Sequence, residues 1–202
     1  MDIASATILL ILVLDPFGNI PLVVATLGRV DEERRRHVIV RECAIAYGAL
    51  LVFLFMGRPL LELMRLSETA IGLAGGLILF LIALRMVFQH PEGPMGDSVI
   101  DAGAGEPYIV PLAIPAIAGP SALATVIVMT SREPGRWPEW MAAITLAMAA
   151  SVTVLLLAAR ISRLIGKRGV SALGRLMGLI LTAIAVEMLL DGITNYVRSL
   201  GS

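Results

Sequence analysis

The chain has few of the residues that form disulfides and metal sites. It contains one cysteine and two histidines among 202 residues. Cys43 stands alone in an apolar segment, which excludes an internal disulfide and a cysteine-based metal cluster. His37 and His90 fall in polar connections, where a histidine metal site is not expected. The sequence therefore predicts no metal and no cofactor.

An excess of charge of either sign is also missing, and so are the common signatures of hydrolases. Sixteen basic residues balance sixteen acidic ones, so overall charge indicates no nucleic-acid partner. There is no H-E-x-x-H, no G-x-S-x-G and no pair of aspartates expected at the membrane midplane. We therefore do not expect an enzyme, although a second buried acid facing Asp15 would reopen that alternative.

Apolar residues dominate what is present. The chain is 57% hydrophobic and 16% charged, with a mean hydropathy of +0.87, which is typical of an integral membrane protein and not of a soluble domain. The sequence predicts an all-α membrane protein with six transmembrane helices. The expected spans are 3–27, 39–57, 69–88, 108–131, 139–159 and 173–196.

Basic residues in the connections predict the orientation of these spans. The first connection carries five arginines and the fifth carries four basic residues, whereas the second and fourth carry two each. Positive charge favours the cytoplasmic side, so we expect both termini outside. The third connection, 89–107, has no Lys or Arg and many Gly and Pro, and is expected to be a cytoplasmic linker between a first three-helix repeat (1–88) and a second (108–202).

An internal repeat supports this division. The sequence Gly76-Leu77-Ile78-Leu79 recurs as Gly178-Leu179-Ile180-Leu181. The glycine that begins each copy is also the second glycine of a G-x-x-x-G pattern, with Gly72 in the first copy and Gly174 in the second. Paired glycines favour close helix packing at equivalent places in the third and sixth spans. Because each half has an odd number of spans, the two repeats are expected to be inverted.

The first span contains a polar break, Asp15-Pro16-Phe17-Gly18-Asn19-Ile20-Pro21. Asp15 lies about 18 Å along the span, near the midplane, where a lone acid is costly and points to function. Two prolines and a glycine interrupt the helical hydrogen bonds and predict a discontinuous helix whose half-helix ends face a ligand. The alternative is a proline kink in which Asp15 bonds to a neighbouring helix.

The fourth span is expected to repeat this break. It contains Pro111-Leu112-Ala113-Ile114-Pro115 and then Gly119-Pro120-Ser121, at about the same depth as Asp15 and Pro16. We therefore predict broken helices in spans one and four, which together indicate a transport site near the midplane.

Several polar residues are candidates for that site, and each has a structural alternative. Asn19 offers donors and an acceptor that suit a zwitterion, and Ser121 adds a hydroxyl beside small residues that leave room for a small ligand or for a crossing helix. Asp15 suits a coupling proton or sodium ion, or pairs with an unidentified donor. Glu187 and Asp191 share one helix face; they form a cation path, or Asp191 marks the outer end of the sixth span.

The two breaks also carry a family resemblance. The first resembles the D-P-x-G-N-x-P signature of the MarC family of bacterial and archaeal membrane proteins, and the second is similar to that family's P-L-A-I-P-x-x-x-G-P. Ser121 departs from the glycine that usually follows the second signature. The resemblance implies a six-span inner-membrane protein that moves glycine- or alanine-like substrates. The substrate-binding candidates it implies are Asp15, Gly18, Asn19, Gly119, Pro120 and Ser121.

The expected function is thus secondary transport of small neutral amino acids, and the alternative is export of other small metabolites or drugs. The expected partners are a small-molecule substrate, membrane lipids, whose anionic heads suit the arginines of the first connection, and a coupling proton or sodium ion. A homo-oligomer is left open, because an apolar dimer surface resembles a surface that faces lipid.

Overall fold

The computed structural model describes residues 1–27, 30–88 and 117–200. All of the regular structure in these ranges is helical, as predicted. The expected linker 89–107 and the part of the fourth span before Ile117 lie outside the described residues. The helices are α1 (Ile3–Leu14), α2 (Ile20–Leu27), α3 (Glu32–Met64), α4 (Glu68–Phe88), α5 (Pro120–Arg132), the short 3-10 helix η3 (Pro134–Arg136) and α6 (Trp137–Leu200).

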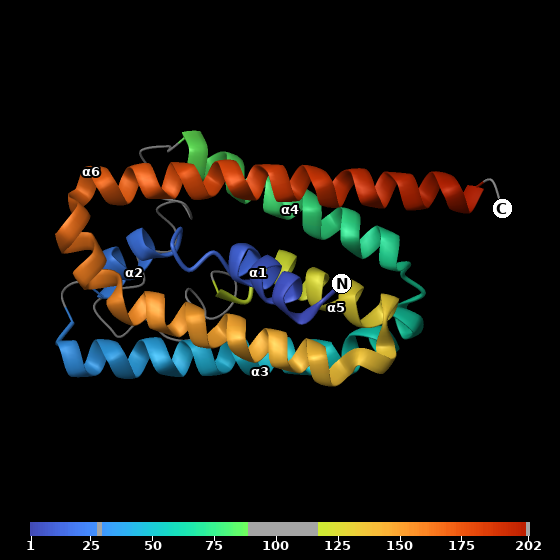
Figure 1. The fold of residues 1–202 in the computed structure, drawn as a ribbon, viewed down its shortest axis with the longest axis horizontal. Helices are drawn as coiled ribbons and strands as arrows, with labels where there is room; N and C mark the ends of the chain where they lie inside the picture. Colours follow the sequence, from blue (N-terminus) through green and yellow to red (C-terminus); the bar gives the residue numbers. More distant parts are fainter. Residues whose placement is uncertain (28–29, 89–116, 201–202) are drawn as a thin grey trace.

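The longest helix, α6, is two helices joined at a sharp turn. Gly166 has φ 68° and ψ 173°, a backbone conformation that glycine adopts without the steric cost of a side chain. The chain reverses direction there, so α6 has a first arm (137–165) and a second arm (167–200) (Figure 1). This turn falls in the connection expected between the fifth and sixth spans.

Four helices in the described ranges are long and apolar enough to cross a membrane. They are Glu32–Leu63, Thr69–Phe88, Pro134–Gly166 and Arg168–Arg198, with mean hydropathies between 2.0 and 2.3. These helices extend or match four of the expected spans. The helix α3 is longer than the predicted span 39–57 at both ends, because its polar first turns and the Arg58–Glu62 ion pair continue the helix beyond the apolar segment.

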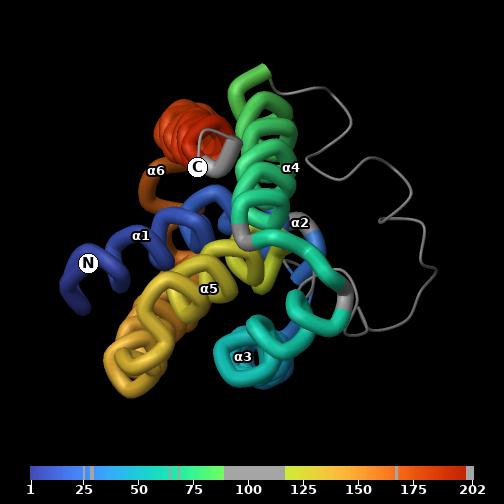
Figure 2. The backbone as a smooth tube through the Cα atoms, turned by 90° about the vertical axis from the view of Figure 1, so that its right-hand side faces the viewer, coloured from blue at the N-terminus to red at the C-terminus, as the bar shows by residue number. Residues whose placement is uncertain are grey.

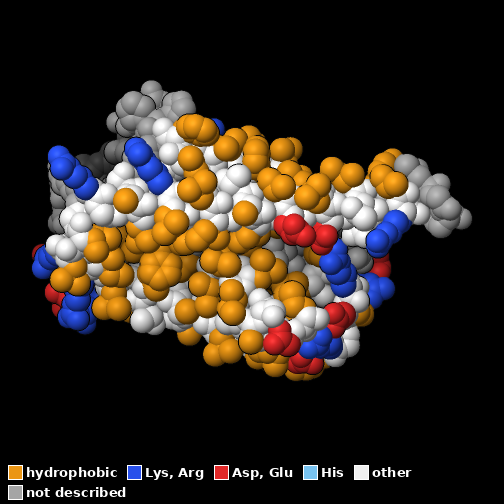
Figure 3. Space-filling model, turned by 45° about the horizontal axis from the view of Figure 1, so that its top comes forward, with side chains coloured by type: hydrophobic (Ala, Val, Ile, Leu, Met, Phe, Trp, Pro, Cys, Tyr) orange, Lys and Arg blue, Asp and Glu red, His pale blue; other side chains and the backbone are white. Residues whose placement is uncertain are grey.

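The surface agrees with a membrane location. Hydrophobic side chains cover the middle of the face drawn in Figure 3, and charged side chains gather toward its two ends. Large apolar residues are exposed on several helices, among them Val52, Leu77, Leu146 and Leu179. Such a belt is unfavourable in water and is stable against lipid.

The helices form three layers. The helix α4 and the second arm of α6 make one outer layer, and α3 with the first arm of α6 makes the other (Figures 1 and 2). The shorter helices α1, α2 and α5 lie between them. Eight of the thirteen residues of α5 are buried, including Ser121, Thr125 and Thr130, because this helix is surrounded by protein.

The predicted close packing of the repeated glycines is confirmed, and its contacts are reciprocal. A Cβ atom added to Gly76 would lie 3.1 Å from Cβ of Met188 and 3.3 Å from the carbonyl oxygen of Ala185. One added to Gly178 would lie 2.9 Å from Cβ of Met86 and 3.0 Å from the carbonyl oxygen of Ala83. The repeat offset of 102 positions relates every residue of the first contact to one of the second. The first glycines of the two patterns contribute less. A Cβ atom added to Gly174 would have no neighbouring atom within 4 Å, and one added to Gly72 would meet only Cγ2 of Val128, at 3.8 Å.

Candidate functional site

The first span is broken and not merely kinked. The helix α1 ends at Leu14, α2 begins at Ile20, and Asp15 between them adopts the left-handed conformation with φ 43° and ψ 59°. Aspartate is one of the few side chains that visit this region readily. The Asp15 N–H donates to the carbonyl oxygens of Ile11 at 3.0 Å and Leu12 at 3.2 Å, which caps α1.

The polar side chains of this break form hydrogen bonds with backbone groups in and beside the break. Asp15 is 8% exposed, and its Oδ1 accepts a hydrogen bond from the Gly18 N–H at 3.0 Å. The Asn19 Nδ2 donates to the carbonyl oxygen of Leu14 at 3.2 Å, and the Asn19 N–H donates to the carbonyl oxygen of Asp15 at 3.1 Å. The break therefore satisfies backbone groups that the missing helical turn leaves free.

Gly18 is required by the space at the break. A Cβ atom at this position would lie 1.9 Å from Oδ2 of Asp15 and 2.4 Å from Cε of Met86 on α4. No side chain fits there unless both the Asp15 carboxylate and the end of the Met86 side chain move. The three predicted residues of the first break, Asp15, Gly18 and Asn19, thus form one compact unit.

The three predicted residues of the second break lie at the start of α5. Gly119 is the N-cap, with φ −64° and ψ 166°, Pro120 occupies the first turn, and Ser121 is 3% exposed. The Ser121 carbonyl oxygen accepts a hydrogen bond from the Thr125 hydroxyl at 2.8 Å. A helix N-terminus carries free N–H groups and positive partial charge, and Pro120 suits its first position.

The first break and the start of α5 both contact α4, at different depths. Gly75 of α4 packs against α5, where its added Cβ would lie 2.5 Å from Cβ of Ala124 and 3.9 Å from Cα of Ser121. Met86 touches the first break at Gly18. Gly75 and Met86 are eleven positions apart, about 16 Å along a helix axis. The two predicted groups therefore contact the same helix, α4, at places about 16 Å apart along it.

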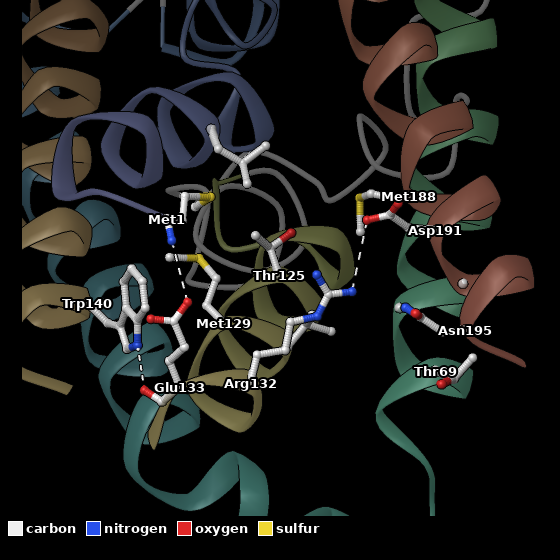
Figure 4. A pocket seen from close by; sticks show the side chains of 14 residues that line it. Met1, Thr69, Thr125, Met129, Arg132, Glu133, Trp140, Met188, Asp191 and Asn195 are labelled. Atoms are coloured by element: carbon white, nitrogen blue, oxygen red, sulfur yellow. Dashed lines mark hydrogen bonds and ion pairs between the residues drawn. The ribbon is translucent and has the colours of Figure 1, made fainter. Parts of the chain in front are cut away.

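A cavity of about 530 Å³ lies at the end of the molecule that holds Met1. We call it the Arg132 cavity; residues of α1, α4, α5 and α6 line it, together with Met1 and Glu133. Arg132 and Asp191 face each other across it, with 3.9 Å between Nη2 and Oδ2 (Figure 4). None of the six predicted site residues, all of which the structure describes, lines this cavity. Sequence reasoning missed it because its walls come from segments far apart in the chain.

A tight polar cluster borders this cavity. The Arg136 guanidinium donates to Oε2 of Glu133 at 2.6 Å, to Glu139 and to the carbonyl oxygen of Met1 at 2.7 Å. It also lies 4.8 Å from the centre of the Trp140 ring, whose Nε1 donates to the carbonyl oxygen of Glu133 at 3.1 Å. The hydrogen bond from Arg136 lowers the pKa of the Glu133 carboxyl below its usual value. This cluster fixes the connection between α5 and α6.

A second buried acid is Glu42, which lies near the start of the expected second span, 39–57. It lies within α3 and is 1% exposed. Its Oε1 accepts hydrogen bonds from Nε and Nη2 of Arg41 at 3.1 and 2.8 Å, while Oε2 has no hydrogen-bond partner among the described residues. The hydrogen bonds that Glu42 accepts in the described chain come from Arg41. They do not pair Glu42 with Asp15, as the enzyme alternative would require.

The described residues contain no group of three or more His, Cys, Asp or Glu side chains placed to hold a metal ion. The buried acids Asp15 and Glu42 form hydrogen bonds with different partners. Asp15 bonds to Gly18 and Glu42 bonds to Arg41. The chemistry available at the breaks is therefore binding by carboxylate, amide and backbone groups.

Comparisons with known proteins cover nearly the whole chain. The model of a family described as MarC family integral membrane protein matches residues 1–197. The UPF0056 inner membrane protein YhgN of Escherichia coli K12 is 43% identical over 197 residues, covering 98% of each chain. A UPF0056 membrane protein of Buchnera aphidicola from Schizaphis graminum is 41% identical over 98% of this chain and 99% of its own. One from Chlamydia pneumoniae is 31% identical over 94% and 93%. No solved structure matches the chain.

Proposed function

Because the chain belongs to the MarC family of integral membrane proteins, we propose that it is a secondary transporter of small neutral amino acids of the glycine or alanine type. Its proposed location is the bacterial inner membrane, as the name of the Escherichia coli relative states for that protein. The observation that carries the proposal is the discontinuous first span, with Asp15 buried between two half-helices. Broken helices at membrane depth are typical of transporter binding sites.

The proposed architecture is six spans in two inverted repeats, 1–88 and 108–202, with both termini outside. The layers of the structure support it: each contains one element expected from each repeat, α4 with the second arm of α6, α1 and α2 with α5, and α3 with the first arm of α6. The reciprocal contacts of Gly76 and Gly178 are what a two-fold relation between the repeats produces.

The proposed binding mode uses both breaks. The substrate carboxylate would lie between the half-helix N-termini of α2 and α5, where Asn19 and the Ser121 hydroxyl add donors. The two N-termini would have to move together for this, because they contact α4 at places about 16 Å apart along that helix. The substrate ammonium, or a coupling proton or sodium ion, would be held by Asp15. Because the Asn19 amide is bonded to the Leu14 carbonyl, binding would exchange that hydrogen bond for one to the substrate. Access would alternate as one repeat rocks against the other.

A second candidate is export of larger metabolites or drugs. The observation that favours it is the Arg132 cavity, which contains the aromatic side chain of Trp140 and several methionines. Methionine-rich surfaces adapt to varied ligands. An intramembrane enzyme would need paired catalytic groups, and the described hydrogen bonds of Asp15 and Glu42 do not supply them.

The test is transport by purified protein in liposomes. Glycine and alanine uptake would be measured under proton and sodium gradients, for wild type, Asn19→Ala and the control Thr153→Ala, which changes an exposed hydroxyl bonded only to its own helix at Ala149. We expect uptake by wild type and the control and loss of uptake in Asn19→Ala. Protein that neither binds nor moves either amino acid under any gradient would remove the proposal.

A further inference from the structure

The Arg132 cavity is lined by apolar side chains and by an ion pair on each of two opposite sides. In Figure 4, Trp140 and Met129 lie opposite Asp191 and Asn195, with Thr125 and Arg132 between them, and the ion pair of the Met1 amino group with Glu133 lies beside Trp140. Leu9 and Val128 add to the apolar lining. Because the pair of Met1 and Glu133 is already formed, a ligand that covers both sides would carry its charge at the Arg132 and Asp191 end and an apolar group at the other.

The charged groups of the cavity are not equally engaged. Glu133 accepts hydrogen bonds from Arg136 and from the amino group of Met1. Arg132 and Asp191, by contrast, are separated by 3.9 Å, and their side chains are 53% and 58% exposed. A pair held this loosely can accept a ligand between its members. Arginine binds carboxylates through two parallel hydrogen bonds, and the Asp191 carboxylate suits an ammonium group.

The volume of the cavity is larger than glycine can fill. About 530 Å³ lies in the range of pockets that enclose ligands much larger than glycine or alanine. Methionine side chains adapt to the shape of an apolar ligand. We propose that the Arg132 cavity binds the charged end of a zwitterion at Arg132 and Asp191 and its apolar side chain against Trp140 and Met129. The amino acids that this cavity prefers are then neutral ones with side chains larger than a methyl group, in addition to the glycine- and alanine-type substrates of the proposed function, on which this conclusion rests.

The first experiment measures equilibrium binding of labelled leucine, alanine and glycine to the purified full chain in detergent. We expect leucine to bind at least about tenfold more tightly than glycine, because its side chain buries apolar surface. Arg132→Gln should weaken leucine binding roughly tenfold or more, through loss of a charge-assisted hydrogen bond. The matched control is Arg58→Gln, because Arg58 pairs with Glu62 on α3 and does not line the cavity.

The second experiment narrows the cavity without disturbing the helices. Gly72 lines it, and a Cβ atom added there would meet only Cγ2 of Val128, at 3.8 Å, which is an ordinary contact. Gly72→Val should weaken leucine binding several-fold and leave glycine binding unchanged, with Gly72→Ala intermediate. Gly48→Val is the control, since nothing lies within 4 Å of a Cβ atom at Gly48.

The outcomes separate this inference from the proposed function. The inference is overturned if glycine binds as tightly as leucine, if Arg132→Gln and Arg58→Gln behave alike, or if leucinol, which lacks the carboxylate, binds as well as leucine. Glycine uptake in liposomes that depends on Asn19 would leave the proposed function standing in each of these cases. Protein that binds none of the three amino acids and moves none of them would overturn both.

Discussion

The break at Asp15 and the Arg132 cavity are built on opposite principles. At the break, Asp15, Gly18 and Asn19 lie within five positions and bond to their own backbone, and the residues are packed so closely that Gly18 has no space for a Cβ atom. The cavity combines residues more than 180 positions apart, and its charged pair is loose and exposed. A local, self-bonded unit has a definite sequence pattern, whereas a cavity assembled from distant segments has none. Substitutions should therefore be severe at the break and mild at the cavity.

The largest effect is expected at Gly18. Gly18→Ala places a Cβ atom against Oδ2 of Asp15 and Cε of Met86, so it should lower the free energy of unfolding by about 3 kcal/mol. Thermal unfolding in detergent would measure this. Gly48→Ala, in open space within α3, should be neutral or stabilising by up to about 1 kcal/mol. Equal melting temperatures for the two variants would show that the break is not tightly packed.

A smaller loss of stability is expected at Asp15. Asp15→Ala removes the acceptor of the Gly18 N–H and places alanine in the left-handed conformation, which together should cost about 2 kcal/mol. Asp15→Asn keeps an acceptor and a side chain suited to that conformation, so it should cost less than about 1 kcal/mol. Thermal unfolding of both variants gives the comparison. An asparagine variant as unstable as the alanine one would mean that the charge, and not the hydrogen bond, stabilises the break.

The cluster beside the cavity should show a modest and pH-dependent effect. The pKa of Glu133 is lowered in the folded protein, so its interaction with Arg136 stabilises the fold above the ordinary carboxyl pKa of 4.5 and is lost as the pH falls through the lowered value. Arg136→Gln should therefore melt below wild type at pH 7, and the difference should shrink as the pH is lowered past 4.5. A difference that stays constant over this range would assign the effect to the contacts of Arg136 that do not titrate, with the Trp140 ring and the Met1 carbonyl oxygen.

The smallest effect is expected at the charged pair of the cavity. Arg132→Gln should change the free energy of unfolding by no more than about 0.5 kcal/mol, because both side chains of the pair are more than half exposed. Thermal unfolding without ligand would measure this. A loss comparable with that of Asp15→Ala would contradict the contrast between the two regions and make Arg132 a structural residue.

The sequence was sufficient for features that are local or repeated. The broken first span follows from Asp15, Pro16 and Gly18, and the close approach of α4 to α6 follows from Gly76 and its repeat at Gly178. Other features depend on three-dimensional neighbours. Glu42 directly follows Arg41, and its nearly complete burial on α3 is seen only in the assembled structure. Likewise, nothing in the separate segments of Arg132 and Asp191 pairs them before the helices assemble.

The position of α1 in the middle layer has a consequence for biosynthesis. The helix α1 leaves the ribosome long before its main packing partner α6, which begins more than 120 residues later. At roughly 5 to 20 residues per second, α1 waits between about 6 and 25 s for these partners. During that interval Asp15 does not need a partner from another helix, because the Gly18 N–H of its own turn already bonds to its carboxylate. A break that completes its own hydrogen bonds is one that the nascent chain can carry into the bilayer before the rest of the protein exists.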